Sequence, residues 1–203
     1  MEQTNNSITL RGSLVELPHF SHENHGRSFY RFLLEVPRLS GAIDTLPVIA
    51  EESILSQVDP TAGSMLTVRG QIRTHNLRNE NGRHLLIFAF ASEILVEDGE
   101  AINQVVLEGP LCREPTYRRT PLGREICDVM LAVPRAFRRA DYLPCILWGR
   151  TAQEISVCHT RDIIRIEGRL QSRIYTKLTE EGSIERTAYE VSALSADILE
   201  PNF

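Results

Sequence analysis

The sequence lacks the features that would place it among membrane proteins, secreted proteins or common enzyme classes. No stretch approaches the roughly 18 consecutive apolar residues that a membrane-spanning helix requires. The N-terminal segment has neither the basic start nor the apolar run of a signal peptide, so we expect a cytoplasmic protein. The GxxxxGK(S/T) and GxSxG motifs are missing and carboxylates recur singly. We therefore expect no enzymatic activity and no cofactor.

Cysteine pairs with the spacing of a metal or redox site are also missing. Cys112, Cys127, Cys145 and Cys158 contain no CxxC motif, which argues against a zinc ribbon. The sequence predicts four reduced, partly buried thiols instead.

Lysine is almost absent, because Lys177 is the only one and every other basic residue is arginine. The net charge of −5 is unfavourable for binding phosphates, but its distribution is uneven. Residues 1–101 hold 8 basic and 13 acidic side chains, whereas residues 102–203 hold 14 of each. The planar guanidinium of arginine suits phosphates and stacks on bases. The second half of the chain is therefore the better candidate for binding a nucleic acid.

An internal repeat organises the whole chain. Residues 6–47 align without a gap on residues 103–144, and fourteen of these 42 positions are identical. Val68-Arg69-Gly70 then corresponds to Ile166-Glu167-Gly168, and residues 92–95 correspond to residues 196–199. The chain is a duplication of one unit, and its boundary falls in the short polar stretch around residues 98–101.

Each copy is rich in segments with strand-like composition. In the second copy, strands are predicted at 104–111, 125–133, 142–148, 163–172 and 186–199. A helix is predicted at 151–158, and its counterpart in the first copy at 52–58. Five strands with a helix after the third are typical of the OB-fold. We predict an all-β protein with two tandem five-stranded OB-fold barrels, residues 1–98 and 102–203, each with a short helix between strands 3 and 4. A two-sheet sandwich is the competing arrangement, and the position of the helix counts against it.

Alternation along the third strand of the second copy separates a core face from an outer face. The core face holds Leu143, Cys145 and Leu147. The outer face holds Tyr142, Pro144, Ile146 and Trp148. This outer face is too aromatic for a purely solvated surface, and the proline indicates an edge or a bulge.

The first copy keeps the core face of this strand but loses the rings. Thr45 stands at the position of Tyr142, and Glu51 stands at the position of Trp148. Rings that served only for hydrophobic packing would be expected to have apolar replacements. Stacking of bases on aromatic side chains, worth roughly 1–3 kcal/mol per base, is a common use of OB-folds. Packing at a protein interface is the alternative, because aromatic residues also anchor interfaces.

At these residues the sequence resembles the bacterial single-stranded DNA-binding protein family. The resemblance begins at Asn103-Gln104-Val105-Val106-Leu107-Glu108-Gly109 and continues through residues 113–123. It includes Tyr142-Leu143-Pro144-Cys145-Ile146-Leu147-Trp148 and residues 166–175. The order and spacing of these pieces cover essentially all of the second copy. The first copy is a more distant relative.

The resemblance implies sequence-nonspecific binding of single-stranded DNA in replication, recombination or repair. It places the four base-stacking rings at Phe137, Tyr142, Trp148 and Tyr175. The corresponding positions of the first copy, near Ser40, Thr45, Glu51 and Leu77, hold no ring, so residues 1–98 are expected to be a degenerate, auxiliary barrel. Candidate phosphate contacts in the second copy are Arg118, Arg119, Arg135, Arg138, Arg139, Arg150 and Arg173.

Assembly and partners also follow from the resemblance. Two barrels per chain favour a homodimer with four barrels, because single-barrel members of the family form tetramers. Members usually end in a flexible linker with an acidic tip that recruits replication and repair proteins. In this chain only the closing Pro-x-Phe at residues 201–203 is similar to that tip, so we do not expect recruitment by this route. Primosomal replication protein N is a tailless relative with the same barrel.

Two further hypotheses remain. His19, His22 and His25 have the spacing of metal ligands, but they fall in a predicted loop after Pro18 and the second copy does not repeat them, so we expect no metal site. The functional rival is an OB-fold protein-interaction or dimerisation module of a primosome-like complex, with weak or no DNA binding. The presence of four rings in the second copy favours DNA.

Overall fold

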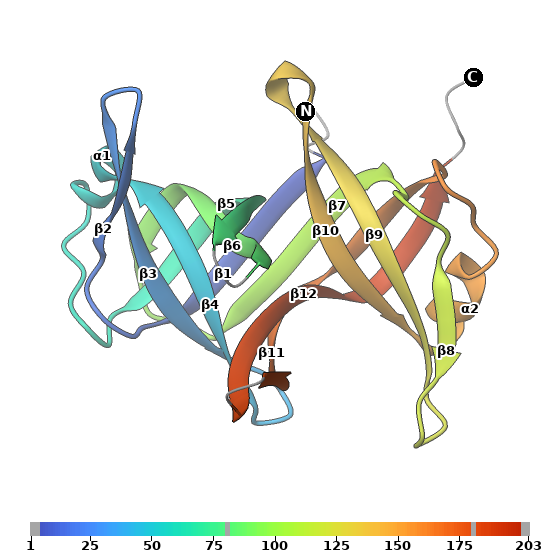
Figure 1. The fold of residues 1–203 in the computed structure, drawn as a ribbon. Coiled ribbons are helices and arrows are strands. Elements are labelled where there is room, and N and C mark those ends of the chain that lie inside the picture. The colour runs from blue at the N-terminus through green and yellow to red at the C-terminus, as the bar shows by residue number, and fades with distance from the viewer. Residues whose placement is uncertain (1–4, 80–81, 180–181, 200–203) are drawn as a thin grey trace.

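Strands dominate the molecule, as the sequence predicts for an all-β protein. A computed structural model describes residues 5–79, 82–179 and 182–199 (Figure 1). The elements of the first half are β1 (Asn6–Leu14), β2 (His19–Asn24), β3 (Arg27–Pro37), β4 (Ile43–Glu51), α1 (Glu52–Leu55), β5 (Met65–Asn79) and β6 (Gly82–Val96). Those of the second half are β7 (Ile102–Pro110), β8 (Thr116–Arg119), β9 (Glu125–Arg135), the 3-10 turn η1 (Ala136–Arg138), β10 (Arg139–Trp148), α2 (Gly149–Ile155), β11 (Ile163–Thr179) and β12 (Gly182–Leu199).

The strand pairings repeat in the two halves. In the first, β1 pairs with both β3 and β5, β3 pairs with β4, β4 runs parallel to β6, and β6 pairs with β5. In the second, β7 pairs with β11, β11 with β12, β12 runs parallel to β10, and β10 pairs with β9. An isolated bridge between Leu111 and Leu131 then links the segment after β7 to β9. Each half is thus a ring of pairings around a core.

The two halves meet at the centre of the sheet. β1 and β7 pair antiparallel, and the strand order is β2-β3-β4-β6-β5-β1-β7-β11-β12-β10-β9-β8. The order is symmetric about the β1–β7 junction, with equivalent strands at equal distances from it. In Figure 1 these two strands lie side by side between the two halves.

Close packing explains why the two copies both have glycine at one position of their first strand. A Cβ on Gly12 in β1 would lie 2.4 Å from the carbonyl oxygen of Glu35, and one on Gly109 in β7 would lie 2.2 Å from that of Ala132. Real Cβ atoms do not approach carbonyl oxygens so closely, so each position requires glycine for its strand to cross its neighbour. The identity of this position in the two copies therefore follows from packing.

The core of each half is built from the predicted faces, with one exception. Leu143 and Leu147 are fully buried and Cys145 is 2% exposed, while Leu46, Val48 and Ala50 fill the same places in the first half. Ile146, predicted on the outer face, is 6% exposed and therefore buried. At this residue β10 is an internal strand of the sheet, with β9 on one edge and β12 on the other. Pro144 makes no bulge; it stands just before the stretch that pairs with β12, where its missing N–H is tolerated.

Helices occur where the repeat predicts them, with shifted ends. α2 begins before the predicted 151–158 segment and places Ala152 and Ile155 in the core, while α1 covers only the start of 52–58. β2 and β8 were not predicted, because their side chains are almost all exposed and show no apolar alternation. Among the described residues, no helix has the length and apolar character needed to cross a membrane.

All four cysteines are free thiols, as predicted. Cys127, Cys145 and Cys158 are buried and Cys112 is half-buried. Burial raises the pKa of Cys127 to about 11, and it also raises the pKa of Cys145. These thiols stay protonated at neutral pH and act as small apolar side chains.

Candidate nucleic-acid interface

The turn between β9 and β10 presents Phe137 to solvent. Its side chain is 93% exposed. Phe137 has φ of 60° and Arg138 has φ of 55°, a left-handed conformation that is uncommon for residues other than glycine. The backbone of η1 therefore turns sharply enough to place an apolar ring almost free of protein contacts. Such a ring can gain contact area from a bound nucleic acid or from a protein partner.

Tyr142 and Trp148 mark the two ends of the exposed side of β10. Tyr142 is 49% exposed and Trp148 is 37% exposed. The indole Nε1 of Trp148 donates a hydrogen bond to the Oγ of Ser192 on β12, at 3.1 Å. This bond satisfies the polar edge of the indole and fixes its orientation while part of the ring remains accessible.

Tyr175 lies on β11, in the long hairpin that β11 forms with β12. It is 38% exposed and pairs in register with Arg186. Its neighbour Ile174 is 68% exposed on the opposite face. All four predicted rings therefore have accessible surface, and they come from two hairpins of the second half.

The four rings do not stack on other aromatic side chains of the described residues. The ring contacts that occur there join Phe20 to Tyr30, His22 to Phe29 and Phe29 to Phe90, all in the first half. Aromatic side chains of the first half thus pack on one another, whereas no ring contact of this kind involves the four rings among the described residues.

Four of the seven predicted arginines are engaged by carboxylates. Arg118 pairs with Asp128 at 2.7 Å, Arg119 with Glu125 at 2.7 Å, Arg135 with Asp141 at 3.2 Å and Arg150 with Glu154 at 2.8 Å. The hydrogen bond to Asp128 raises the pKa of Arg118, and the hydrogen bond to Glu125 raises that of Arg119. Each of these arginines must share its charge with an acidic partner, which weakens its attraction for phosphate.

The other three are exposed and carry their charge without such a partner. Arg138, Arg139 and Arg173 make no ion pair within the part of the chain that the structure describes. Arg138 directly follows Phe137 and Arg139 begins β10. Arg173 lies two residues before Tyr175 on β11. The uncompensated positive charges therefore adjoin the exposed rings in sequence.

Sequence reasoning missed one aromatic residue in this region. Tyr117 is 41% exposed on β8, between Thr116 and Arg118. A hydrogen bond to Glu125 raises the pKa of its hydroxyl. The two arginines that directly follow this tyrosine, Arg118 and Arg119, are the signal that would have identified it as a further candidate.

The first half offers a different surface at the equivalent positions. Ser40 is exposed, Thr45 is half-buried, and Leu77 is 41% exposed. Glu51 accepts a hydrogen bond from Ser53 at 2.9 Å and pairs with Arg27 at 3.4 Å. None of these side chains provides an aromatic face, as the sequence predicts.

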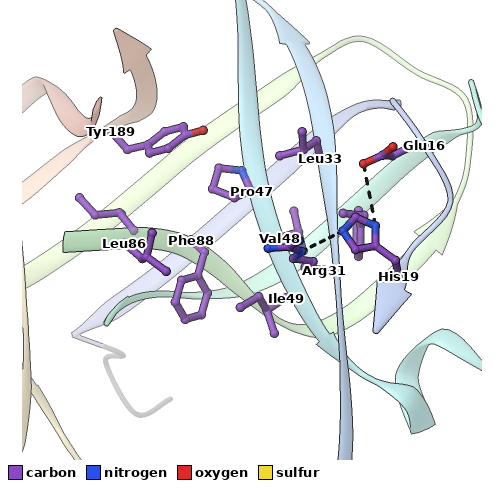
Figure 2. A pocket seen from close by; sticks show the side chains of 12 residues that line it. Glu16, His19, Arg31, Leu33, Pro47, Val48, Ile49, Leu86, Phe88 and Tyr189 are labelled. Carbon is purple, nitrogen blue, oxygen red and sulfur yellow. Dashed lines mark hydrogen bonds and ion pairs between the residues drawn. The ribbon is translucent and has the colours of Figure 1, made fainter. Parts of the chain in front are cut away.

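A pocket of about 360 Å³ opens on the first half instead (Figure 2). Strands β3, β4 and β6 form it, and Tyr189 on β12 of the second half lines it as well. Its walls are largely apolar, with Pro47, Ile49, Leu86 and Phe88 pointing into it. We call it the first-half pocket. It is distinct from the positions of the four rings.

One edge of the first-half pocket is polar. The Nε of Arg31 donates to the Nε2 of His19 at 2.8 Å, and the Nδ1 of His19 lies 3.8 Å from Glu16 (Figure 2). Because Nε2 accepts, the proton of a neutral His19 is on Nδ1, facing Glu16. The second half has Asp128 at the position of Arg31, where it pairs with Arg118. The two halves therefore present opposite charges at this place.

The predicted loop at His19, His22 and His25 is in part a strand. His19 and His22 lie on β2, because Phe20 packs on Tyr30 and His22 stacks on Phe29 of β3 with centroids 4.9 Å apart. These ring contacts supply the hairpin stability that the sequence did not indicate. Among the described residues, no three potential ligands gather in a metal-binding group.

The fold has close counterparts among solved structures. The wild-type single-stranded DNA binding protein from Thermus aquaticus superposes with a TM-score of 0.80 over 98% of this chain and 94% of its own, at 22% identity. A deletion mutant of that protein gives a TM-score of 0.78 over 100% of this chain. At this level of identity the likeness establishes the architecture: a mostly β, OB-fold type of structure.

Sequence relatives identify the family. A model of the single-strand binding protein family matches residues 102–199. The single-stranded DNA-binding protein B of Bacillus subtilis is 38% identical over 87 residues, which are 39% of this chain and 75% of that protein. The single-stranded DNA-binding protein of Bacillus cereus is 35% identical over 109 residues, which are 49% of this chain and 61% of that protein. The chain belongs to the bacterial single-stranded DNA-binding protein family. Its members are non-catalytic binding proteins, in agreement with the expectation of no enzymatic activity.

Proposed function

We propose that this protein binds single-stranded DNA with little sequence preference, by stacking bases on the second half. The observation that carries the proposal is the exposure of Phe137, Tyr142, Trp148 and Tyr175, which ranges from 37% to 93%. Residues 102–199 are also the part of the chain that matches the family. Every base has a π-face, so stacking of this kind tolerates any sequence.

The phosphates would be held chiefly by Arg138, Arg139 and Arg173, which have exposed guanidinium groups without carboxylate partners among the described residues. The paired arginines of the predicted set have a secondary role. Arg118, Arg119 and Arg150 would need to exchange an acidic partner for phosphate, and Arg135 is held by the buried Asp141. Neutralisation of phosphates releases counterions, so affinity should fall as salt rises.

We further propose two OB-fold barrels as domains, at residues 1–98 and 102–203, and a homodimer that contains four barrels. The repeated ring of strand pairings supports the first part, and the resemblance to tetrameric single-barrel relatives supports the second. The protein would act in the cytoplasm in replication, recombination or repair, in company with proteins of those processes.

The first half would serve assembly and extend the path of the strand at lower affinity. The first-half pocket offers Phe88 and Tyr189 as rings and Arg31 as a cation. Three further arginines of the first half, Arg27, Arg69 and Arg73, each pair with a carboxylate. One cation and recessed rings support a contribution smaller than that of the second half.

Titration with an oligothymidine strand at low salt tests the proposal. Trp148 is the only tryptophan, so its fluorescence reports directly on one proposed stacking position. We expect quenching that saturates with the oligonucleotide and that reverses when salt is added. Unchanged emission, together with no oligonucleotide bound at low salt, would instead support a protein-interaction module.

A further inference from the structure

The two halves are related by a local two-fold axis through the β1–β7 junction. Ile8 of β1 lies opposite Val105 of β7, and these two residues occupy the same position of the repeat. In such an arrangement a contact that one half makes to the other occurs a second time in the reverse direction. The structure contains such a reciprocal contact, built on Asp141 and Asp44.

In the first of the two contacts, Asp141 of β10 binds β5 of the other half. Its side chain is fully buried. Its Oδ1 accepts the backbone N–H of Thr74 at 2.7 Å and the Thr74 hydroxyl at 3.1 Å, while Oδ2 accepts Arg73 at 3.0 Å. The Thr74 hydroxyl oxygen in turn accepts the backbone N–H of Tyr142 at 3.3 Å. One hydroxyl group thus bridges the buried carboxylate and a proposed stacking residue.

In the second contact, Asp44 of β4 binds β11 in the same way. It is also fully buried, and its Oδ1 accepts the backbone N–H of Ser172 at 2.7 Å and the Ser172 hydroxyl at 3.1 Å. Arg38 of its own half donates to it at 2.7 Å. Gln171 stands where the first contact has Arg73, and it donates to Glu190 instead.

The two contacts differ in what they support. Asp141 also accepts Arg135 at 3.2 Å, so it holds both ends of the turn that carries Phe137. That turn has two residues with positive φ, and its exposed ring gives it little packing of its own. The equivalent turn beside Asp44 carries Leu39 and Ser40 and no ring. Asp44 closes this turn in the same way through Arg38, so what differs is the exposed ring, which only the turn beside Asp141 carries. The reciprocal contact at Ser172 lies beside Arg173 on β11.

We propose that the first half positions the stacking residues of the second half, with Thr74 as the positioning residue. Its hydroxyl, held by Asp141, fixes the start of β10 and through it the placement of Tyr142 and Phe137. A strand of bases then meets rings that are already ordered, so less conformational entropy is lost on binding. This inference rests on the proposed function and assigns the first half a task that needs no contact with DNA.

Three substitutions in the full-length protein test it. Thr74→Val keeps the shape of the side chain and removes the hydroxyl, and Thr74→Ser keeps the hydroxyl. Thr67→Val is the matched control, because it removes a buried hydroxyl of the same strand, β5, which accepts a hydrogen bond from Arg11 at 2.7 Å. Affinity for an oligothymidine strand, its salt dependence and urea unfolding are measured for each. Thr74→Val and Thr67→Val should both lower stability. Thr74→Val alone should weaken DNA binding, by about tenfold for one hydrogen bond lost at an ordered site. Its salt dependence should stay that of the wild type, because no phosphate contact is removed.

The inference is overturned if Thr74→Val binds as the wild type does, or if Thr67→Val loses as much affinity as Thr74→Val. Equal losses in Thr74→Ser and Thr74→Val would also overturn it, since the hydroxyl would then not be the cause. If Thr74→Val does not fold, Arg73→Gln takes its place, because it installs the residue found at the equivalent position of the other contact. It should bind about threefold more weakly, and wild-type affinity would overturn the inference. A wild-type protein that binds no oligothymidine would overturn the proposed function itself.

Discussion

Removing the ring of Phe137 should separate DNA binding from stability. The side chain is 93% exposed. An aromatic residue buries about 150–250 Å² when fully covered, so the covered fraction here, about 15 Å², is worth about 0.4 kcal/mol. Phe137→Ala should therefore leave the free energy of unfolding almost unchanged. Loss of one stacked base should cost about 1–3 kcal/mol of binding free energy, which is about 5-fold to 150-fold in affinity.

Leu39→Ala is the matched control. Leu39 is a fully exposed apolar residue in the equivalent turn of the first half, next to the position that corresponds to Phe137. We expect it to change neither urea unfolding nor affinity for an oligothymidine strand, measured by anisotropy of a labelled strand. The reasoning fails if Phe137→Ala binds as the wild type does, or if Leu39→Ala loses affinity to the same extent. A loss of stability above about 2 kcal/mol in Phe137→Ala would show that the ring packs in a core.

Four further predictions concern the arginines, one ring, a glycine and a buried carboxylate. The double variant Arg138→Ala/Arg139→Ala should flatten the slope of log affinity against log salt by about 1.4, since each phosphate contact to a single strand contributes about 0.7. Arg150→Ala is the control: this arginine is paired with Glu154, so its loss should change the slope less. Tyr175→Leu, which installs the residue found at the equivalent position 77 of the first half, should lower affinity for an oligothymidine strand by about fivefold or more. Leu77→Ala should leave this affinity unchanged, and equal losses in the two variants would refute the proposal that the second half binds more tightly than the first. Gly109→Ala should lower the free energy of unfolding in urea by more than about 2 kcal/mol, because its Cβ would clash with the backbone of Ala132. A Cβ at Gly123 would meet no atom within 4 Å, so Gly123→Ala should cost only about 1 kcal/mol, for its positive φ. Asp44 should stabilise the protein at neutral pH and stop doing so in acid. Burial raises its pKa, but hydrogen bonds from Arg38 and Ser172 outweigh burial and leave the pKa below its usual value. A depressed pKa means stability that is present above the unfolded pKa, near 3.8, and is lost as pH falls through the folded pKa. Asp44→Asn should therefore have a smaller free energy of unfolding than the wild type at pH 7, and this difference should become smaller below pH 4. A difference that does not change with pH would contradict a lowered pKa for Asp44.

The repeat made much of this fold predictable from the sequence. Periodicity on β10 identified Leu143 and Leu147 as core. The reason for the glycine shared by positions 12 and 109, a close approach of strands, became visible only in the structure. β2 and β8 escaped detection, because a strand whose side chains are mostly exposed leaves no apolar alternation to read. Ile146 was misplaced because alternation assigns every second side chain to the outer face and does not show how much of that face is buried.

The candidate site was predictable in its rings and less so in its charges. A ring on a polar face is visible in sequence as an aromatic residue where the other copy has Thr45 or Glu51. Ion pairing depends on contacts across strands: Arg118 meets Asp128 only because β8 pairs with β9. The binding of Asp141 to Thr74 is equally invisible, since it joins residues far apart in the chain. Sequence therefore identified the arginines, and only the fold separated the engaged ones from the available ones.

Joining β1 and β7 within one polypeptide has a consequence for how the two copies can diverge. Their association is intramolecular, so it persists at any dilution and does not depend on a dissociation constant between subunits. A separate subunit would need a self-complementary surface, in which every substitution appears in both partners at once. A fused pair is free of that constraint, and either copy can be specialised while its neighbour keeps the ancestral shape.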